Sequence, residues 1–260
     1  MYVTQQHYFD GAYSGTDLWS FDYENGSWRA VPALDAMHQG SNLIVTASSD
    51  DEQIGYVVNH ERDGNYVGSD AQTGLIDRDE AWIKDGKSDI SLGNGTVSAI
   101  SNHAYVGYDS HFFPAPPHFL KPPDAFAWVH GRKSELGHGL PWAVNRSGII
   151  VGDNRSTVTS PGQPVAWYHG RITPLSHLAG SAFGINERNQ IVGDIETRGG
   201  FLATINGRGT SLEMLDNDLA SAGYGWHIEH AYAIASDGSI LAVGKFKNER
   251  ERLVMLVPGS

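Results

Sequence analysis

The chain has 260 residues, of which 40% are hydrophobic and 18% are charged, and this composition is typical of a folded globular protein. Its formal net charge of −12 disfavours nucleic acid and anionic membranes as partners, since both carry negative charge. The sequence holds no cysteine, which excludes disulfides, thiolate zinc sites and a cysteine nucleophile.

The N-terminal stretch "MYVTQQHYFDG" has neither the basic start nor the apolar core of a signal peptide. A chain whose leader had been removed would look the same, so the sequence leaves cytoplasmic and secreted locations open. No apolar run approaches the roughly 18 residues that a membrane-spanning helix needs, so no membrane segment is expected.

The first fifty residues predict β-strands. The segment 17–34, "DLWSFDYENGSWRAVPAL", indicates a hairpin around a Gly-containing turn, and "SNLIVTAS" at 41–48 indicates a further apolar strand. We expect these strands to form one structural unit and to lend a strand to the last unit of the chain.

From residue 57 onward one phrase recurs: an apolar residue, Asn, a few turn residues, and then apolar–Val–Gly. With some variation it occupies 57–70, 99–109, 143–154, 184–195 and 233–246. Each copy predicts two short strands joined by a tight turn. The closing glycines at 68, 107, 152, 193 and 244 are 39, 45, 41 and 51 residues apart, which is about 44 on average.

A second phrase follows each of the first four copies, at 80–92, 125–136, 165–175 and 199–212, and it also predicts two strands around a Gly-containing turn. Trp82, Trp128 and Trp167 recur at one position of this phrase. A large ring at a fixed place in each unit is what packing one unit against the next requires. Only 211–223, "SLEMLDNDLASAG", is expected to form a helical turn.

Four strands in each unit of about 44 residues are typical of a β-propeller. We therefore predict an all-β fold, with residues 1–260 forming a single propeller domain of four-stranded blades closed by the N- and C-terminal strands. The length predicts six blades, because 260 divided by about 44 is close to six. Five blades are the alternative, if residues 17–68 form one overgrown unit.

The units resemble the HAF-type repeats of bacterial, mostly secreted proteins, over about residues 80–257. That family's phrase is an apolar–aromatic–Trp strand, a Gly turn, a Leu, and then an "IN..G.IVG" element. It is matched by Phe126–Trp128, Gly131, Leu136, Val144–Asn145 and Ile149–Gly152, and again by Val165–Trp167, Gly170, Leu175, Ile185–Asn186 and Ile191–Gly193. The segment 17–34 is more similar to a kelch unit. The resemblance implies the propeller fold and no particular activity.

Loop length predicts where a site would lie. The turns inside each hairpin are short, whereas the connections between hairpins carry every long insertion, including 69–80, 109–124, 153–164 and 215–230. These connections lie at one face of a propeller. Because binding groups usually lie on loops held by a rigid scaffold, we expect a pocket at this face, over the central channel.

Six of the twelve histidines fall on the loop-rich face: His111, His118, His138, His177, His227 and His230. Histidine suits proton transfer near neutral pH and divalent metals, although polar loops also carry such residues without function. By contrast, His130 and His169 lie in repeated "HGR" turns of the plain face and are interpreted as turn residues.

Carboxylates recur where the second strand of a unit ends, at Asp70, Asp109, Asp153 and Asp194, and the last unit has Lys245 there. Two interpretations stay open. The carboxylates either cap their own loops or point toward the mouth of the channel. Lys245 breaks the pattern and is expected to pair with a neighbouring carboxylate.

Two insertions carry aromatic side chains. "HFFPAPPHFLKPP", within 109–124, is stiffened by proline and predicts a lid, an apolar wall or an oligomer contact. In "GYGWHIEH" (223–230), His227 and Glu229 form either a base with the residue that orients it, or two metal ligands.

We predict an enzyme that uses acid–base chemistry of the lyase, cyclase or hydrolase type on a small organic or sugar-like molecule, without a cofactor. The candidate acids and bases are His111, His138, His177, His227 and Glu229. The candidate binding residues are Phe112, Phe113, His118, Tyr224, Trp226, His230 and Lys245. A divalent metal in the channel is a further possibility, and a non-catalytic glycan- or protein-binding module is the alternative function.

Overall fold

A computed structural model of the protein describes residues 2–9, 12–22, 27–30, 42–49, 53–59, 80–85, 88–101, 104–109, 122–129, 132–156, 160–206, 209–221, 223–247 and 249–259. The chain divides into two compact units, which are described separately. The first unit holds Met1–Ile100 with Gly107–Lys121, and the second holds Ser101–Val106 with Pro122–Ser260.

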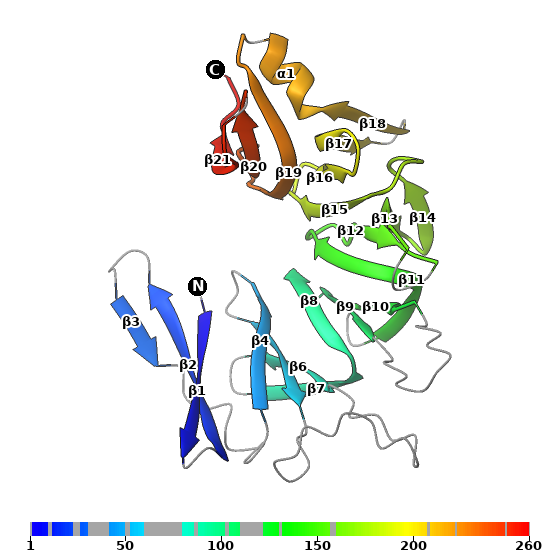
Figure 1. Ribbon diagram of the computed structural model, residues 1–260. Helices are drawn as coiled ribbons and strands as arrows, with labels where there is room; N and C mark the ends of the chain where they lie inside the picture. The colour runs from blue at the N-terminus through cyan, green and yellow to red at the C-terminus, as the bar shows by residue number, and fades with distance from the viewer. Residues whose placement is uncertain are drawn as a thin grey trace. The chain divides into compact units, whose positions relative to one another are not determined.

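The first unit is built from antiparallel strands (Figure 1). One sheet has the order β1-β2-β3, from β1 (Tyr2–Phe9), β2 (Ala12–Asp22) and β3 (Ser27–Ala30). A second sheet has the order β4-β5-β6-β7, from β4 (Asn42–Ser48), β5 (Ile54–Asn59), β6 (Glu80–Asp85) and β7 (Ser88–Asn94). The hairpin predicted within 17–34 is therefore confirmed as β2–β3.

The strand assignment of the first copy of the repeated phrase was wrong. Residues 57–59 belong to β5, which pairs with β4 on one side and β6 on the other, so they are not the first strand of the predicted hairpin at 57–70. The other residues of that prediction, 60–70, lie outside the described residues. The segment 41–48 supplies the first strand of this sheet. Ser49 explains the error: its Oγ accepts from the Gln53 N–H and closes the turn as Asn does elsewhere, so a search for Asn misses it.

The second unit contains nearly all of the repeated sequence. Its strands are β10 (Asp124–Val129), β11 (Arg132–Val144), β12 (Ile150–Asn154), β13 (Gln163–Tyr168), β14 (Arg171–Pro174), β15 (Gly180–Ile185), β16 (Gln190–Ile195), β17 (Gly199–Asn206), β18 (Gly209–Met214), β19 (Trp226–Ile234), β20 (Ile240–Phe246) and β21 (Arg252–Leu256). The boundary between the units runs through β8 (Thr96–Ser101) and β9 (Ala104–Asp109). Helix α1 (Leu215–Ser221) lies against β17 and β19 and confirms the helical turn predicted within 211–223.

Strand β11 serves two sheets. Its first half pairs with β10, and from Gly139 onward it pairs with β12. Residues 137–141, which connect the predicted hairpins at 125–136 and 143–154, are therefore part of a strand. Further along the chain come one four-stranded sheet, β15-β16-β17-β18, and one three-stranded sheet, β19-β20-β21, each with neighbouring strands antiparallel.

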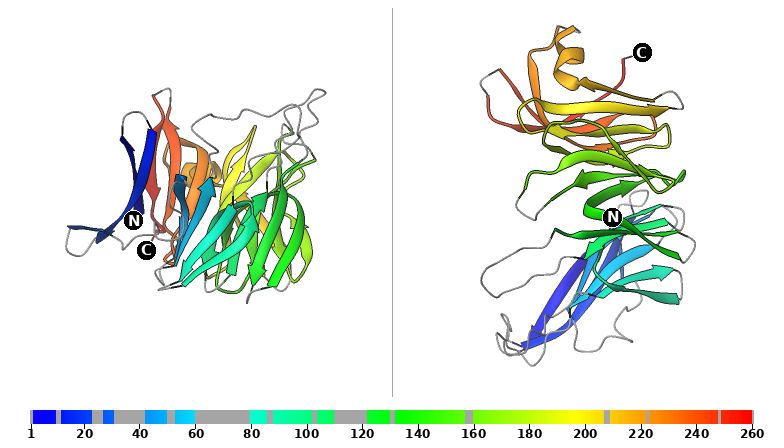
Figure 2. Two further views of the ribbon diagram at one scale, coloured as in Figure 1. Left: turned by 90° about the horizontal axis from the view of Figure 1, so that it is seen from below. Right: turned by 90° about the vertical axis from the view of Figure 1, so that its right-hand side faces the viewer.

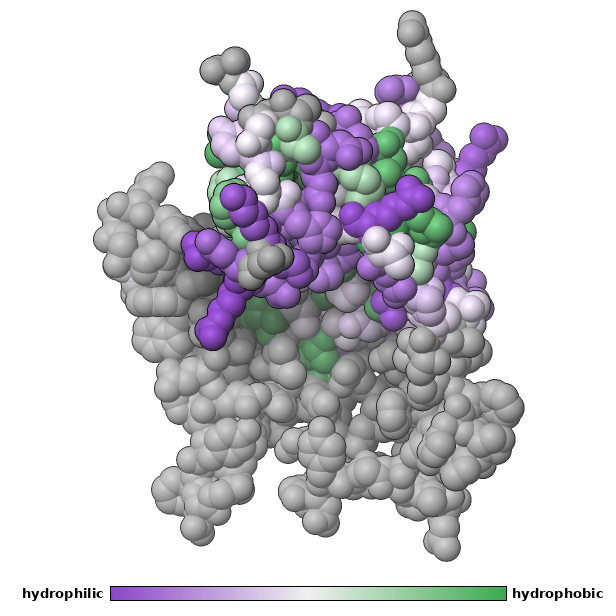
Figure 3. Space-filling model, turned by 45° about the horizontal axis from the view of Figure 1, so that its top comes forward, coloured by the Kyte–Doolittle hydropathy of each residue, from purple (hydrophilic) through white to green (hydrophobic). Residues whose placement is uncertain are grey.

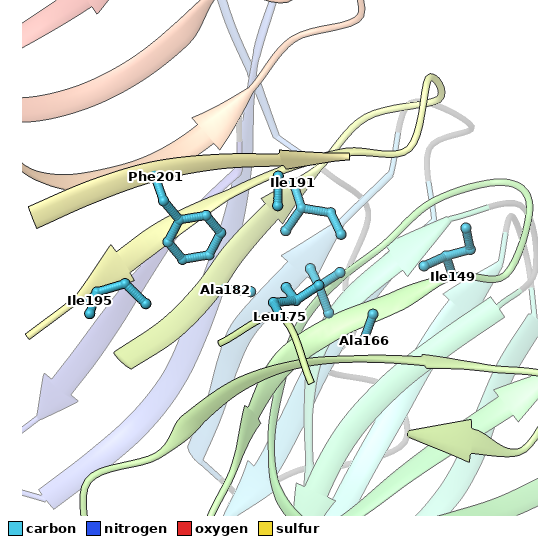
Figure 4. Close-up of a cluster of buried hydrophobic side chains, with 9 residues drawn as sticks. Ile149, Ala166, Leu175, Ala182, Ile191, Ile195 and Phe201 are labelled. Carbon is cyan, nitrogen blue, oxygen red and sulfur yellow. The ribbon is translucent and has the colours of Figure 1, made fainter. Parts of the chain in front are cut away.

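Apolar side chains fill the space between consecutive sheets. The right-hand view of Figure 2 shows the β11–β14 and β15–β18 sheets lying one on the other, as their contacts also show. Figure 4 shows the cluster between them, to which the β15–β18 sheet contributes Ile191 and Phe201 and the β11–β14 sheet contributes Ala166. Each large side chain buried in this way contributes about 1.5–3 kcal/mol.

A buried asparagine explains the repeated Asn of the sequence. Asn186 accepts from the Gln190 N–H at 3.0 Å, which closes its own turn, and its Nδ2 donates to the Ala235 carbonyl of the next sheet at 3.0 Å. Asn145 has the same role in the preceding repeat, since its Nδ2 donates to the Asn186 carbonyl at 3.1 Å. The motif residue therefore both shapes a hairpin and ties it to its neighbour.

The closing glycine of the motif is required by a close approach of two strands. A Cβ on Gly193 would lie 2.0 Å from the Ser181 carbonyl oxygen, and one on Gly152 would lie 2.1 Å from the Leu140 oxygen. No side chain fits at these distances, because the backbone of the neighbouring strand occupies the space.

The repeated tryptophan also has the predicted role in one unit. Trp167 is buried, and its indole Nε1 donates to the Leu136 carbonyl in β11 at 2.9 Å.

The face seen in Figure 3 is covered mostly by hydrophilic residues where the structure describes it. Within the described ranges, no helix has both the length and the apolar character to cross a bilayer.

We expect Asn186→Ala to destabilise the protein by about 2–3 kcal/mol, because it removes several hydrogen bonds and leaves the Ala235 carbonyl without this donor. Chemical denaturation measures the loss. The control is Asn217→Ala on the exposed side of α1, which should change stability by less than about 1 kcal/mol. Equal effects of the two substitutions would contradict the bridging role of Asn186.

Candidate functional site

A shallow depression of about 400 Å³ opens beside the end of β12 and the start of β15 in the second unit. Its lining is mostly polar and consists of Arg155, Ser160, Pro161, Gly162, Gly180, Ser181, Phe183, Asp194 and Glu196. Asp153 in β12 and Asp194 in β16 are two of the carboxylates predicted from the repeat.

Asp153 is fully buried and all its oxygens are occupied. Its Oδ1 lies 2.5 Å from Arg155 Nε, and its Oδ2 accepts from Trp142 Nε1 at 3.1 Å and from the Ser181 hydroxyl at 3.0 Å. A buried carboxylate is tolerated only with such partners. Asp153 therefore holds its own loop, as the capping interpretation expects, and also bridges to the next sheet.

Asp194 occupies the equivalent position one unit later, and it lines the depression. Its Oδ2 lies 2.5 Å from Nδ1 of His230, which projects from the first strand of the next sheet. An ionised carboxylate accepts hydrogen bonds, so this contact favours the tautomer with hydrogen on Nδ1. The Nε2 of that tautomer carries a lone pair and can accept a proton.

A second histidine–carboxylate pair lies on the same strand. His227 Nδ1 contacts Oδ2 of Asp216, in the first turn of α1, and Asp216 Oδ1 accepts from the Ile228 N–H at 2.7 Å. The carboxylate that contacts Nδ1 of His227 is therefore Asp216 and not Glu229. Asp216 was missed because a carboxylate in a short helix carries no repeat signal.

Glu229 pairs instead with Lys245, which confirms that the odd lysine of the last unit meets a neighbouring carboxylate. A hydrogen bond from Lys245 holds the pKa of Glu229 below its usual value, and the same bond raises the pKa of Lys245. A carboxylate kept ionised in this way is a weak proton donor, so Glu229 is better suited to holding Lys245 than to acting as an acid.

Other predicted site residues lie elsewhere or outside the described residues. His138 Nδ1 is 2.9 Å from Asp124 Oδ1 and is half exposed. His177 is exposed, and its backbone carbonyl accepts from Gln163 Nε2 at 3.3 Å. Neither His138 nor His177 lines the depression, and His230 reaches it only through its contact with Asp194. His169 is an exposed turn residue as predicted. Outside the described residues lie Asp70, His111, Phe112, Phe113 and His118.

The aromatic residues Tyr224 and Trp226 line a separate hollow of about 450 Å³. Its other lining residues are apolar and come from α1 and the C-terminal segment: Leu219, Val254, Met255, Leu256 and Val257. Tyr224 and Trp226 therefore do not belong to the depression that Asp194 lines. Among the described residues, no group of three or more His, Asp or Glu side chains is arranged to hold a metal ion.

No family model and no curated protein matches the sequence. Solved structures do match. An acylaminoacyl peptidase from Pyrococcus horikoshii has a TM-score of 0.56 and 11% identity over 98% of this chain. The β-propeller domain of the Trilobed protease from Pyrococcus furiosus, described as having an open velcro topology, has a TM-score of 0.54 and 11% identity over 92% of this chain.

This chain spans 42% of the matched peptidase chain and 73% of the matched propeller-domain chain. At such low identity the likeness shows the fold alone. The protein is an all-β chain whose fold is similar to a β-propeller domain.

We expect Lys245→Met to raise the pKa of Glu229 toward the usual value of a glutamate, since the hydrogen bond that lowers it is removed. Carboxyl NMR titration measures the change. Because the folded pKa is the lower one, the pair contributes stability above the ordinary pKa and loses it as the pH falls through the folded pKa. Lys247→Met is the control and should leave the Glu229 titration unchanged; a shift there, or none in Lys245→Met, contradicts the assignment.

Proposed function

We propose that this chain is a β-propeller enzyme that uses acid–base chemistry on a small organic or sugar-like molecule bound in the Asp194 depression. The observation that carries the proposal is the contact between Asp194 and His230. Asp194 lines the cavity and also contacts Nδ1 of His230, which leaves Nε2 as the ring nitrogen that can accept a proton.

The chemistry needs only proton transfer. His230 takes a proton from the substrate at Nε2, and Asp194 stabilises the imidazolium that forms, as a carboxylate does for the base of other histidine enzymes. A hydrolase, lyase or cyclase can work by such a step without a cofactor. The His227–Asp216 pair on the same strand is the candidate for the second proton transfer.

Six blades closed by strands from both ends of the chain remain our proposal for the architecture. The strand groups β1–β3, β4–β7, β8–β11, β11–β14, β15–β18 and β19–β21 support that number. The last group has three strands where the β15–β18 sheet has four, which leaves a place for a strand from the N-terminal end. Membership of the HAF-type repeat family, and oligomer contact through 109–124, stay predictions.

A non-catalytic binding module is the second candidate. It is favoured by the match to a propeller domain and to 42% of a longer peptidase chain, because a piece of a larger enzyme can bind a ligand without reacting with it. Elemental analysis of the purified protein tests the further possibility of a divalent metal.

The test is a screen of the purified protein against nitrophenyl esters, nitrophenyl glycosides and a set of polysaccharides, with mass spectrometry of the products. For any activity found, we expect His230→Asn to lower kcat by about 10²–10⁴-fold, because the proton acceptor is lost. The matched control is His169→Asn. His169 is exposed with φ 49°, a conformation that Asn adopts readily, so activity should persist.

Full activity in His230→Asn would remove the acid–base assignment. Binding of a ligand from the screen without turnover by the unaltered protein would favour the binding module. A loss of activity in both variants would show a general effect of substitution and would also contradict the assignment to His230.

A further inference from the structure

Three aromatic rings follow one another along the second unit. The first strands of three consecutive sheets each carry a bulge. In β11 it lies between Pro141 and Ala143, in β15 between Ala182 and Gly184, and in β19 between Ala231 and Ala233. The extra residue of each bulge is aromatic: Trp142, Phe183 and Tyr232. A bulge re-aims one side chain out of the regular alternation of a strand.

The rings form a continuous strip. The centroids of Trp142 and Phe183 are 6.1 Å apart, and those of Phe183 and Tyr232 are 5.6 Å apart. The strip ends at His230, whose ring centroid is 5.8 Å from that of Tyr232. Phe183 is partly exposed and lines the depression, and Tyr232 is 44% exposed, so the strip offers apolar surface to solvent.

Carboxylate and guanidinium groups flank the strip on the side of the depression. Asp194, Glu196 and Arg155 line the depression with Phe183. The charges are largely paired, since Arg155 is bound to Asp153 and Asp194 is bound to His230. Among these lining residues Arg155 is therefore not available to an acidic ligand, and only the exposed Glu196 would attract a cation.

We propose that this strip and the adjoining depression bind a neutral carbohydrate chain, with sugar rings lying on Phe183 and Tyr232 and hydroxyl groups hydrogen-bonded to Asp194 and Glu196. The C–H bonds on one face of a pyranose meet the electron-rich face of an aromatic ring favourably. Carboxylate oxygens accept hydrogen bonds from hydroxyl groups.

The spacing favours a chain over a single sugar. Three rings from three consecutive sheets repeat every 5.6–6.1 Å, which presents apolar surface along a line that a single small molecule would not cover. The inference rests on the proposed function in one respect, since it names the substrate class of the same site.

The test uses an array of immobilised neutral, uronic acid-containing and sulfated glycans, followed by calorimetry with the best soluble oligosaccharide. We expect the unaltered protein to bind neutral glycans, and Tyr232→Ala to bind at least about tenfold more weakly because the exposed ring is lost. Tyr232→Phe keeps the ring and should bind within about threefold of the unaltered protein. Tyr168→Ala, at a 41% exposed tyrosine of β13, is the matched control and should bind normally.

Absence of glycan binding, binding only to acidic or sulfated glycans, or unchanged affinity in Tyr232→Ala would each overturn the inference. Thermal unfolding of every variant separates lost binding from lost folding, and if Tyr232→Ala is unfolded, weakened binding by Phe183→Leu decides in its place. Turnover of a non-carbohydrate substrate with no glycan binding would overturn this inference alone. Glycan binding that depends on Tyr232 without any turnover would overturn the acid–base proposal and support the inference.

Discussion

The second unit depends on a buried asparagine that satisfies two hairpins at once. Asn145 and Asn186 are almost fully buried, and each closes its own turn and donates to a backbone carbonyl in the next sheet. A buried carbonyl without a donor is costly, so a hairpin placed one residue out of register would lose both sets of bonds. The spacing of the sheets is thereby fixed at one end of each strand pair, while the apolar cluster around Phe201 fills the space between them.

The opposite end of the same strand pair is held by carboxylates, and this is where chemistry becomes possible. Asp153 and Asp194 occupy equivalent positions and both reach the first strand of the next sheet. The residue that each meets there is different, Ser181 in one case and His230 in the other. The same position of the repeat therefore gives a structural hydrogen bond at Asp153 and a histidine–carboxylate pair beside a depression at Asp194. Repetition supplies the geometry, and a single change of partner alters what the position can do.

The bulges of the first strands add a second kind of surface to the same region. Each places an aromatic side chain, Trp142, Phe183 or Tyr232, at the point where the ladder is interrupted. Trp142 is also tied to the carboxylate system, because its indole donates to Asp153. Apolar and polar groups thus meet along one line, which is the combination that ligands with both hydroxyl groups and apolar faces require. In contrast, Tyr224 and Trp226 lie against the C-terminal strand, away from these groups.

The sequence by itself determined most strands of the second unit and the recurrence of one hairpin, because period, turn residues and the close-approach glycine are local properties of the chain. It also located Asp153, Asp194 and Lys245 by repeat position, and His230 as a histidine of a long insertion. It failed where another residue does the work of the motif, as Ser49 does in the turn after β4. Only the tertiary structure decided which carboxylate meets which histidine, since Asp194 and His230 are 36 residues apart and Asp216 comes from a helix outside the repeat. Side-chain pairing across sheets depends on how neighbouring repeats pack together, and no pattern within one repeat encodes it.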